Sequence, residues 1–227
     1  MQDSAVSERK RHYHQFCSVA RALDVVGERW SLLIIRELLL GPRRYSDLLA
    51  RLKGITPNLL AKRLADMECH DLITKQQHSS IGSTHVYELS EVGRELEPVV
   101  LSLGRFGIRY MLSGPKDDDL MDIGWGLLVL KLRYQGQKSG TITLLLDGDA
   151  DAVIQCYQVK FSPSYVDIRH GQHWASDVVV SLSVLDYRRL AFQGASLAEL
   201  NAKNKIKVEG QQKKWLHFLV SFGFELE

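Results

Sequence analysis

Apolar residues recur at helical spacing through the first half of the chain. Val19, Leu23 and Val26 repeat at intervals of four and three residues, and Gly27 follows them, which predicts a helix that stops at the glycine. Residues 30–40 are apolar nearly all round apart from an Arg-Glu pair. A helix with that pattern is typical of the buried centre of a domain.

Two shorter helices are predicted next, joined by a tight turn. Residues 45–52 form the first helix, residues 53–55 the turn and residues 56–70 the second helix. Thr56 is a good N-cap residue, and Pro57 suits the first helical position, where its missing N–H costs nothing. Two short helices around a glycine-containing turn predict a helix-turn-helix, in which the second helix reads DNA.

The second of these helices has two different faces. Leu60, Leu64 and Met67 fall on one face, and Asn58 and Lys62 fall on the opposite one. Between residues 43 and 63, six Lys and Arg residues accompany a single acid. Short and cationic outward side chains are typical of a helix that enters the major groove. The alternative is an ordinary solvated amphipathic helix, and the neighbouring segments favour DNA binding.

A β-hairpin is predicted directly after this helix. Two strand-like runs, residues 72–77 and 84–89, flank a tip rich in hydroxyl groups. A hairpin in this position indicates a wing, whose tip commonly lies over the DNA backbone or minor groove. His78, Ser79 and His85 at the tip suit phosphate contact, and the alternative is an ordinary surface loop.

A helical pattern then runs from residue 90 to residue 112. Its apolar positions step by four and three residues, which predicts a heptad-like seam. The seam consists of Val92, Leu96, Val99, Leu103, Phe106 and Tyr110. Pro98 conflicts with one unbroken helix, so we expect a kink or a new helix there. The seam fits either a dimer interface or packing within its own domain.

Three motifs in the first half, in this order, resemble the HxlR family of bacterial transcriptional regulators. They are Cys-x-x-x-x-Ala-Leu-x-x-x-Gly-x-x-Trp at 17–30, Arg-Glu-Leu-Leu-Leu-Gly-Pro-Arg-Arg-Tyr-Ser-Asp-Leu at 36–48 and Gly-Ile-Thr-Pro-Asn-Leu-Leu-Ala-x-Arg-Leu at 54–64. Residues 88–96 resemble the family's exit from the wing. The resemblance covers about residues 15–112. It implies a dimeric winged helix-turn-helix protein that binds near promoters, with the seam helix in the dimer interface.

This arrangement assigns roles to the polar residues of the motif. Asn58 and Lys62 are expected to face base edges, whereas other side chains hold the backbone. The residues expected at phosphates are Arg43, Arg44, Tyr45 and, from the helix N-terminus, Thr56. Arg63 projects to the side, where a phosphate contact or a structural role fits better than base contact.

Cys17 carries an alternative mode of regulation. It matches the position near the N-terminus where several HxlR-type regulators keep a redox-responsive cysteine. Arg21 follows one helical turn later, where its charge favours the thiolate. The competing interpretation is that Cys17 packs as a small apolar residue.

The pattern changes beyond residue 112. Residues 113–119 combine turn residues with an acidic run, which indicates a linker. Alternating segments bounded by turn residues then predict a mixed domain. The expected strands are residues 126–134, 141–146, 152–159, 165–170, 178–184 and 206–209, and the expected helices are residues 186–192, 197–203 and 211–222.

Part of this second half resembles sterol-carrier-protein-like domains. The likeness rests on the patterning of residues 176–200 and on the Lys207-Val-Glu-Gly turn, and it would cover about residues 118–227. Such domains are α+β folds whose sheet and helices enclose an apolar tunnel. The residues expected to line it are Leu190, Phe192, Leu197, Leu200, Trp215, Phe218, Leu219 and Phe222. The alternative is a filled core that merely aids dimerisation.

These patterns predict an α+β chain of two domains. The first, residues 1–112, is a winged helix-turn-helix domain for DNA binding and dimerisation. Residues 113–119 form the linker, and residues 120–227 form a sterol-carrier-like domain with a mainly antiparallel sheet.

Composition and charge add modest limits. The 227 residues are 45% hydrophobic and 25% charged, as in an ordinary globular protein. Residues 1–112 carry 16 Lys and Arg against 13 Asp and Glu, and residues 113–227 carry 13 against 14, so the positive excess lies in the predicted DNA-binding half. The chain shows no apolar run long enough to span a membrane, no apolar signal core, and three widely spaced cysteines, all of which favour the cytoplasm.

Motifs for enzymatic chemistry are missing from the sequence. There is no Gly-x-Ser-x-Gly, P-loop or Gly-x-Gly-x-x-Gly. Residues 147–151 imitate the start of a calcium loop without its glycine and closing glutamate, and the His-x-His and His-x-x-His pairs lack partner ligands, so no metal and no cofactor are expected.

Two functions compete. The favoured one is a transcriptional regulator whose partners are double-stranded promoter DNA, a second copy of itself and an apolar small-molecule effector. The other is a carrier of, or enzyme acting on, fatty acyl or sterol-like molecules, with a vestigial winged domain. The complete DNA-binding motifs and the missing catalytic ones favour the regulator.

Overall fold

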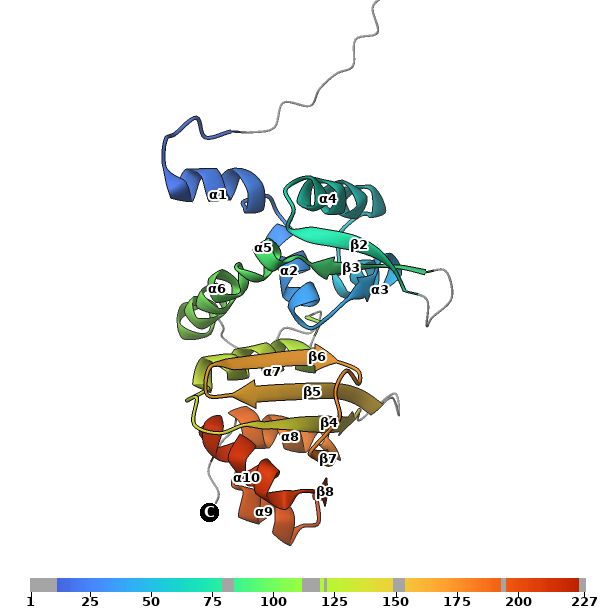
Figure 1. The fold of residues 1–227 in the computed structure, drawn as a ribbon, viewed down its shortest axis with the longest axis vertical. Helices are drawn as coiled ribbons and strands as arrows, with labels where there is room; N and C mark the ends of the chain where they lie inside the picture. Colours follow the sequence, from blue (N-terminus) through green and yellow to red (C-terminus); the bar gives the residue numbers. More distant parts are fainter. Residues whose placement is uncertain are drawn as a thin grey trace, which may run out of the picture.

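The computed structural model describes residues 12–78, 84–111, 119–120, 122–148, 154–192 and 195–224. Its N-terminal half is built mainly from helices (Figure 1). The first elements are α1 (Ser18–Val26), α2 (Ser31–Leu39), β1 (Arg43–Arg44), α3 (Tyr45–Arg51) and α4 (Pro57–Cys69). The central helix α2 buries Ile34, Ile35 and Leu38 completely, as its apolar pattern predicts.

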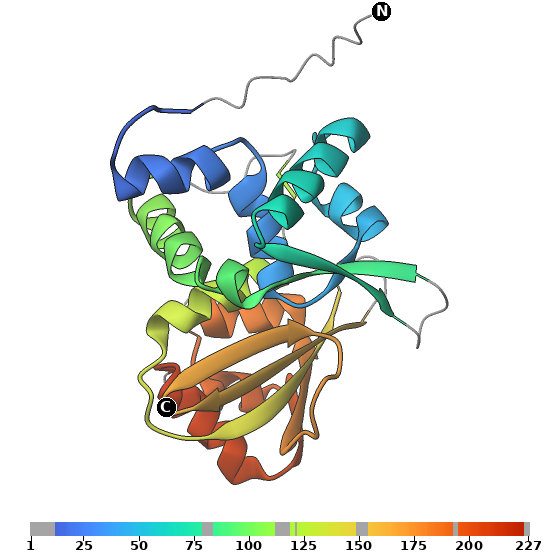
Figure 2. The same cartoon turned by 45° about the horizontal axis from the view of Figure 1, so that its top comes forward.

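A three-stranded antiparallel sheet completes the N-terminal half. It contains β2 (Ile73–His78) and β3 (Thr84–Leu89), and its strand order is β1-β3-β2. The two long strands form the predicted wing next to α4 (Figure 2). The two-residue strand β1 is not predicted by the sequence pattern, because it exists through pairing with β3, Arg43 opposite Tyr87 and Arg44 opposite Val86.

The expected interruption at Pro98 is present. The short helix α5 (Glu91–Arg94) ends just before α6 (Glu97–Tyr110), and Pro98 occupies the first turn of α6, where its missing N–H is tolerated. Gly93 within α5 is required by close packing, because a Cβ there would lie 1.9 Å from the Leu72 carbonyl oxygen.

The C-terminal half is an α+β unit around a five-stranded sheet of order β6-β5-β4-β7-β8. All neighbouring strands are antiparallel except β4 and β7, which are parallel, so the sheet is mainly antiparallel, as predicted. Its strands are β4 (Gly140–Asp147), β5 (Ile154–Ser162), β6 (Tyr165–His170), β7 (Val178–Ser183) and β8 (Ile206–Gly210). Its helices are α7 (Ile123–Leu130), the 3₁₀ turn η1 (Lys131–Arg133), α8 (Val184–Phe192), α9 (Leu197–Ala202) and α10 (Gln212–Ser221).

The strand predicted at residues 126–134 is wrong, because this segment forms α7 and η1. Residues 123–130 are apolar on all sides, and a short run of that kind shows neither helical nor strand periodicity. Asp122 decides the outcome locally, since its carboxylate accepts a hydrogen bond from Gly124 N at 2.8 Å and caps the helix.

The two halves share a continuous apolar interior. Helices α8 and α10 pack on the sheet, and α7 lies between β6 and the N-terminal half (Figure 1). Buried residues from both halves form one connected cluster, with Leu40 packed close to Gly124. His170 N also donates a 2.8 Å hydrogen bond to Leu40 O. The two predicted domains therefore share one apolar core among the described residues, and the domain division at residues 112 and 120 stays a prediction. Within the described residues, no helix is long and apolar enough to cross a membrane.

Candidate nucleic-acid interface

The start of α4 is fixed by its own residues. The Thr56 hydroxyl accepts a hydrogen bond from Leu59 N at 3.3 Å, and Pro57 occupies the first helical position. Gly54 in the preceding turn has φ +95°, a conformation that strains residues with a side chain. The local sequence thus sets where α4 begins and at what angle the chain enters it.

The two faces of α4 lie as the periodicity predicts. Leu60, Leu64 and Met67 are buried, whereas Asn58 and Lys62 are exposed. The first turn of α4 contains no acidic residue, so the positive end of the helix dipole is not offset there. An exposed amide, an exposed amine and a helix N-terminus form a surface suited to a polyanion.

Arg63 supports α4 instead of projecting to the outside. Its Nη2 atom lies 2.6 Å from Glu28 Oε2, and its Nε donates to the Arg29 carbonyl oxygen at 3.2 Å. These contacts hold α4 against the segment between α1 and α2. Two roles are predicted for Arg63, a phosphate contact and a structural one, and these contacts support the structural role.

Three residues that are predicted to contact phosphates lie around the start of α3, each in a different environment. Tyr45 donates from its hydroxyl to the Pro57 carbonyl oxygen at 2.8 Å, which ties α3 to the first turn of α4. Arg44 is half-buried, and its backbone N donates to Asp47 at 3.3 Å. Arg43 is only 7% exposed, and burial together with the nearby Arg51 lowers the pKa of its guanidinium. A phosphate contact is predicted for Arg43 and requires it at the surface. Instead, the pairing of β1 with β3 turns Arg43 inward.

The wing is described only in part. His85 on β3 is exposed and lies opposite Gln77 of β2. Ser79 and the side chain of His78 lie outside the described residues, so their predicted phosphate contacts stay predictions.

A buried charged cluster, which we call the Glu37 cluster, connects the helix-turn-helix to the second half. The Glu37 carboxylate, 0% exposed, accepts hydrogen bonds from Arg36 Nη2 at 2.7 Å, Arg51 Nε at 2.6 Å and Trp125 Nε1 at 2.7 Å. Arg51 Nη2 also lies 2.7 Å from Asp122 Oδ2. Burial alone would lower the pKa of Arg51, but the hydrogen bond and charge of Glu37 outweigh it and raise that pKa.

The sequence pattern gives little sign of this cluster. Arg36 and Glu37 are visible only as an interruption of an apolar helix, and their partners are up to 88 residues away. A charged pair inside an otherwise apolar helix is the one available signal, since buried charges require partners.

Comparisons with known proteins agree on the N-terminal half. The HxlR-like helix-turn-helix family matches residues 25–114. An uncharacterized HTH-type transcriptional regulator of Synechocystis sp. is 33% identical over 91 residues, which are 40% of this chain and 67% of that protein. The chain belongs to the HxlR-like helix-turn-helix family.

Two further matches give the extent of the likeness. An uncharacterized HTH-type transcriptional regulator of Mycobacterium tuberculosis is 42% identical over 94 residues, which cover 41% of this chain and 59% of that relative. The solved structure of the redox regulator HypR in its oxidized form is 27% identical, with a TM-score of 0.39 over 41% of this chain and 96% of that one. The family match and the two sequence relatives identify the N-terminal half of this HxlR-like protein as that of a DNA-binding transcriptional regulator.

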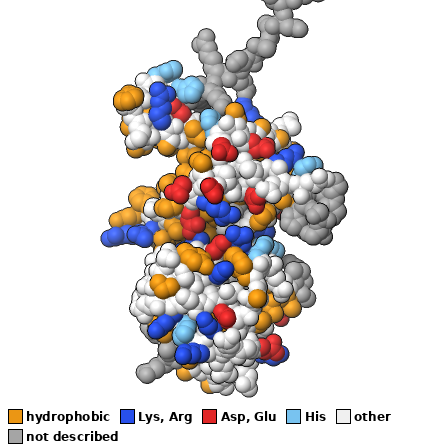
Figure 3. All heavy atoms as spheres, in the orientation of Figure 1, with side chains coloured by type: hydrophobic (Ala, Val, Ile, Leu, Met, Phe, Trp, Pro, Cys, Tyr) orange, Lys and Arg blue, Asp and Glu red, His pale blue; other side chains and the backbone are white. Residues whose placement is uncertain are grey.

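The predicted seam of this HxlR-like protein lies mostly at the surface. Hydrophobic side chains gather along one side of the molecule, over α1 and α6 (Figure 3). Val92 on α5 and four positions on α6 are 43–60% exposed. These α6 positions are Val99, Leu103, Phe106 and Tyr110. Leu96, in contrast, is half-buried and packs against the core.

The predicted ligand-pocket residues have a different environment from the one expected. All except Phe192 are at most 7% exposed, and they pack together as the core of the C-terminal half: Leu190, Leu197, Leu200, Trp215, Phe218, Leu219 and Phe222. Trp215 stacks on Phe218 with ring centroids 5.3 Å apart, and Phe218 lies 4.6 Å from Phe222. A hollow of about 290 Å³ touches Leu197 and Trp215. Most of the predicted lining residues therefore lie in an aromatic core, and the ligand pocket and the sterol-carrier resemblance both stay predictions.

The remaining predicted residue is Cys17. It is an exposed free cysteine at the N-cap of α1. Arg21 lies 3.8 Å from Asp24, so its charge already has an acidic neighbour. Redox sensing by Cys17 stays a prediction. Among the described residues, no group of three or more His, Cys, Asp or Glu side chains could hold a metal ion.

Proposed function

We propose that this HxlR-like protein is a homodimeric transcriptional regulator that places α4 of each subunit in the major groove of promoter DNA. The exposed face of α4 carries this proposal, because Asn58 and Lys62 are exposed on the first two turns of a helix whose other face is buried. Asn hydrogen-bonds adenine edges and Lys guanine edges in the major groove.

The surroundings of α4 supply backbone contacts in this proposal. Arg44, the Thr56 end of α4 and His85 on the wing lie on the flanks where phosphates pass. Tyr45 and Arg63 hold α4 in position through their contacts with Pro57 and Glu28. Reading and positioning are thereby divided between the outward and lateral side chains.

The dimer part of the proposal rests on the exposed apolar side chains of α6. Leaving several large apolar residues in water on one helix is unfavourable, and a second copy related by a two-fold axis would bury them symmetrically. Two α4 helices would then lie about 34 Å apart, one turn of DNA, on a pseudo-palindromic site.

Mobility shifts with the regulator's cognate promoter test the DNA-binding part. Lys62→Ala and Asn58→Ala should each weaken cognate binding by about 1–3 kcal/mol and relax sequence preference. Arg44→Ala should weaken cognate and unrelated DNA alike and make the salt dependence shallower. Lys213→Ala, which changes an exposed lysine on α10 far along the chain, is the matched control and should bind as the wild type does. Unchanged affinity in both α4 variants would mean that α4 does not read DNA.

A further inference from the structure

A large apolar groove lies at the junction of the two halves. It has a volume of about 750 Å³, within the range of small-molecule sites. Helix α6 runs beside α7 at this junction (Figure 2). The groove is lined by α2, α6, α7 and the end of α8, and its apolar walls include Leu33, Val100, Ile108, Val129 and Phe192.

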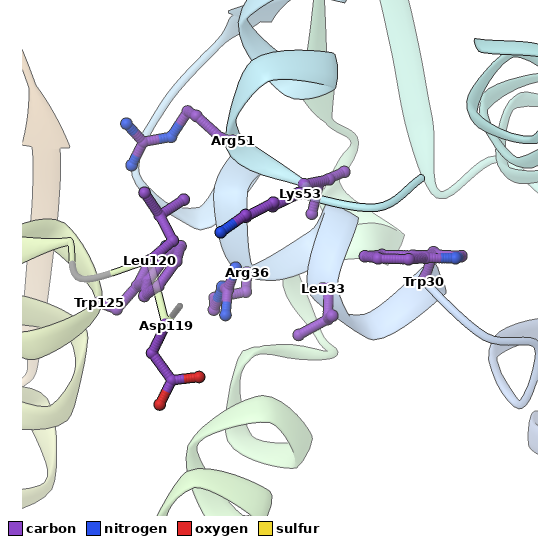
Figure 4. Close-up of a pocket in the computed structure, with 9 residues that line it drawn as sticks. Trp30, Leu33, Arg36, Arg51, Lys53, Asp119, Leu120 and Trp125 are labelled. Atoms are coloured by element: carbon purple, nitrogen blue, oxygen red, sulfur yellow. The ribbon is translucent and has the colours of Figure 1, made fainter. Parts of the chain in front are cut away.

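A polar pocket adjoins the groove. It has a volume of about 450 Å³, and it shares Leu33, Arg36 and Trp125 with the groove. Figure 4 shows Arg36, Arg51 and Lys53 around this pocket with Asp119 and Trp125. Arg36, Arg51 and Lys53 line it with the carboxylate of Asp119, but Glu37 already pairs with both arginines and Asp122 with Arg51, so these groups together carry no net charge. The side chain of Arg36 is still 21% exposed, and Glu37 accepts from only two of its five N–H groups. An anionic group at this edge of the pocket can accept the others. The guanidinium of Arg36 lies 3.8 Å from the centre of the Trp125 ring and marks the boundary between the two spaces.

Two glycines widen the groove. Gly104 and Gly107 lie in α6 and line it, and a Cβ at either position would meet no described atom outside the nearby helix backbone within 4 Å. Glycine inside a helix is destabilising relative to alanine, and no close packing among the described residues requires it at these two places. The missing side chains leave room for a guest molecule.

We propose that this junction binds an amphipathic carboxylate, with its apolar chain in the groove and its anionic head beside Arg36. The proposal rests on the proposed regulatory function for its biological role, and it moves the effector site from the core of the C-terminal half to the contact between the halves. Desolvation also lowers the pKa of the Arg36 guanidinium, and a carboxylate would compensate for that lost hydration.

The groove differs from the predicted dimer seam. In helical projection the groove residues Val100, Gly104 and Gly107 are centred roughly 120° around α6 from Val99 and Phe106. Leu103 borders both surfaces. A second subunit can therefore cover the seam while the groove still holds a small molecule.

The Glu37 cluster offers a route from this site to DNA. Arg36 and Trp125 contact both the proposed ligand and Glu37, and Glu37 also holds Arg51 of α3. A carboxylate that competes with Glu37 for Arg36 would change how α3 is held against α7. Promoter affinity changes only if the ligand binds the DNA-competent and incompetent states differently.

Isothermal titration calorimetry with the full chain tests the site. Dodecanoate, below its micelle concentration, should bind saturably at one molecule per chain, and 1-dodecanol, which has the same chain without charge, should bind at least about tenfold more weakly. Gly107→Leu fills the groove and should weaken dodecanoate binding at least about tenfold while the melting temperature stays equal or rises, because leucine is the better helix former. Ala202→Leu, on the exposed end of α9, is the matched control and should bind dodecanoate normally. Equal binding of dodecanoate and dodecanol, or unchanged binding by Gly107→Leu, would overturn the proposal.

Further variants separate the other outcomes. Gly104→Leu repeats the groove test should Gly107→Leu fail to fold. Arg36→Gln should weaken dodecanoate binding and leave dodecanol binding unchanged, with circular dichroism to verify the fold.

A Gly107→Leu variant that binds dodecanoate normally but loses its oligomeric state would show that the groove is a subunit interface, and the ligand site would be rejected. Because calorimetry uses no DNA, its failure leaves the mobility-shift result standing, and a failed mobility shift leaves the ligand site standing.

Discussion

At the scale of single residues, Glu37 concentrates more interactions than any predicted site residue. Its buried carboxylate receives donors from α2, α3 and α7. Ion pairs of this kind contribute little net stability over apolar residues of similar volume, but removal of one partner leaves a buried charge uncompensated. The consequence of losing Glu37 is therefore large and concerns both halves of the chain.

Glu37→Gln tests that consequence. The variant keeps the shape of the side chain but removes the carboxylate that pairs with Arg36 and leaves Arg51 with Asp122 alone, so the free energy of unfolding should fall by about 3–5 kcal/mol. Urea unfolding followed by circular dichroism measures it. Glu209→Gln is the control, because Glu209 pairs with Lys207 at the surface and such pairs contribute about 0–1 kcal/mol. Equal stability of the two variants would show that the cluster does not support the fold.

The three cysteines should differ in reactivity. Cys17 and Cys69 are exposed, whereas Cys156 is half-buried on β5 and burial raises the pKa of its thiol. In mildly alkaline buffer, iodoacetamide should modify Cys17 and Cys69 well before Cys156, as mass spectrometry of the folded protein would show. Modification of Cys156 at the same rate as Cys17 would contradict this order. An unreactive Cys17 would also remove its predicted redox role.

At the scale of elements, local sequence predicts most of the fold. The capping residues and periodicity around Thr56 predict α4 and its outward face, and β3 and β6 have the predicted bounds. The two failures have non-local causes. β1 depends on pairing with β3, so the inward direction of Arg43 could not be read from its neighbours in sequence. Helix α7 is apolar on all sides, which removes the periodicity that distinguishes a helix from a strand.

The same distinction applies to the candidate sites. For residues on one helix, such as Asn58 and Lys62, the helical period predicts which face of the helix they occupy, and both are exposed. The junction between Arg36 and Trp125 unites residues 89 positions apart in the chain, and no local pattern brings them together. The aromatic residues of α10 were predicted at helical spacing, but whether they line a tunnel or fill a core depends on packing across the sheet.

The exposed face of α6 carries the prediction at this scale. Replacing Val99 and Phe106 together by lysine places two charges in the proposed interface, and the protein should become monomeric while it stays folded. Leu185→Lys with Val220→Lys is the matched control, since both residues are similarly exposed, on α8 and α10, and this variant should remain dimeric. Sedimentation equilibrium measures the mass of each. A dimer that persists in the folded Val99 and Phe106 variant would place the interface elsewhere.

At the scale of the whole molecule, the joined interior has a consequence for stability. The apolar cluster runs from α2 through Leu40 to α7 and the sheet, and ion pairs such as that of Lys131 with Glu97, at 2.6 Å, bridge the same junction. A wet, polar contact would let the halves unfold separately. A continuous buried core instead predicts that they unfold as one cooperative unit.

Leu219→Ala distinguishes these two behaviours. Leu219 is 0% exposed on α10, so its truncation should lower the free energy of unfolding by about 2–5 kcal/mol. In a cooperative molecule that loss reaches the N-terminal half, and slow-exchanging amides of α4 should lose as much protection as those of β4. Hydrogen exchange measured by mass spectrometry reports both regions, with Leu216→Ala, exposed on the same helix, as the control that changes neither. Protection lost in β4 alone would mean that the halves unfold independently, and a ligand at their junction would then have to act by changing how they associate.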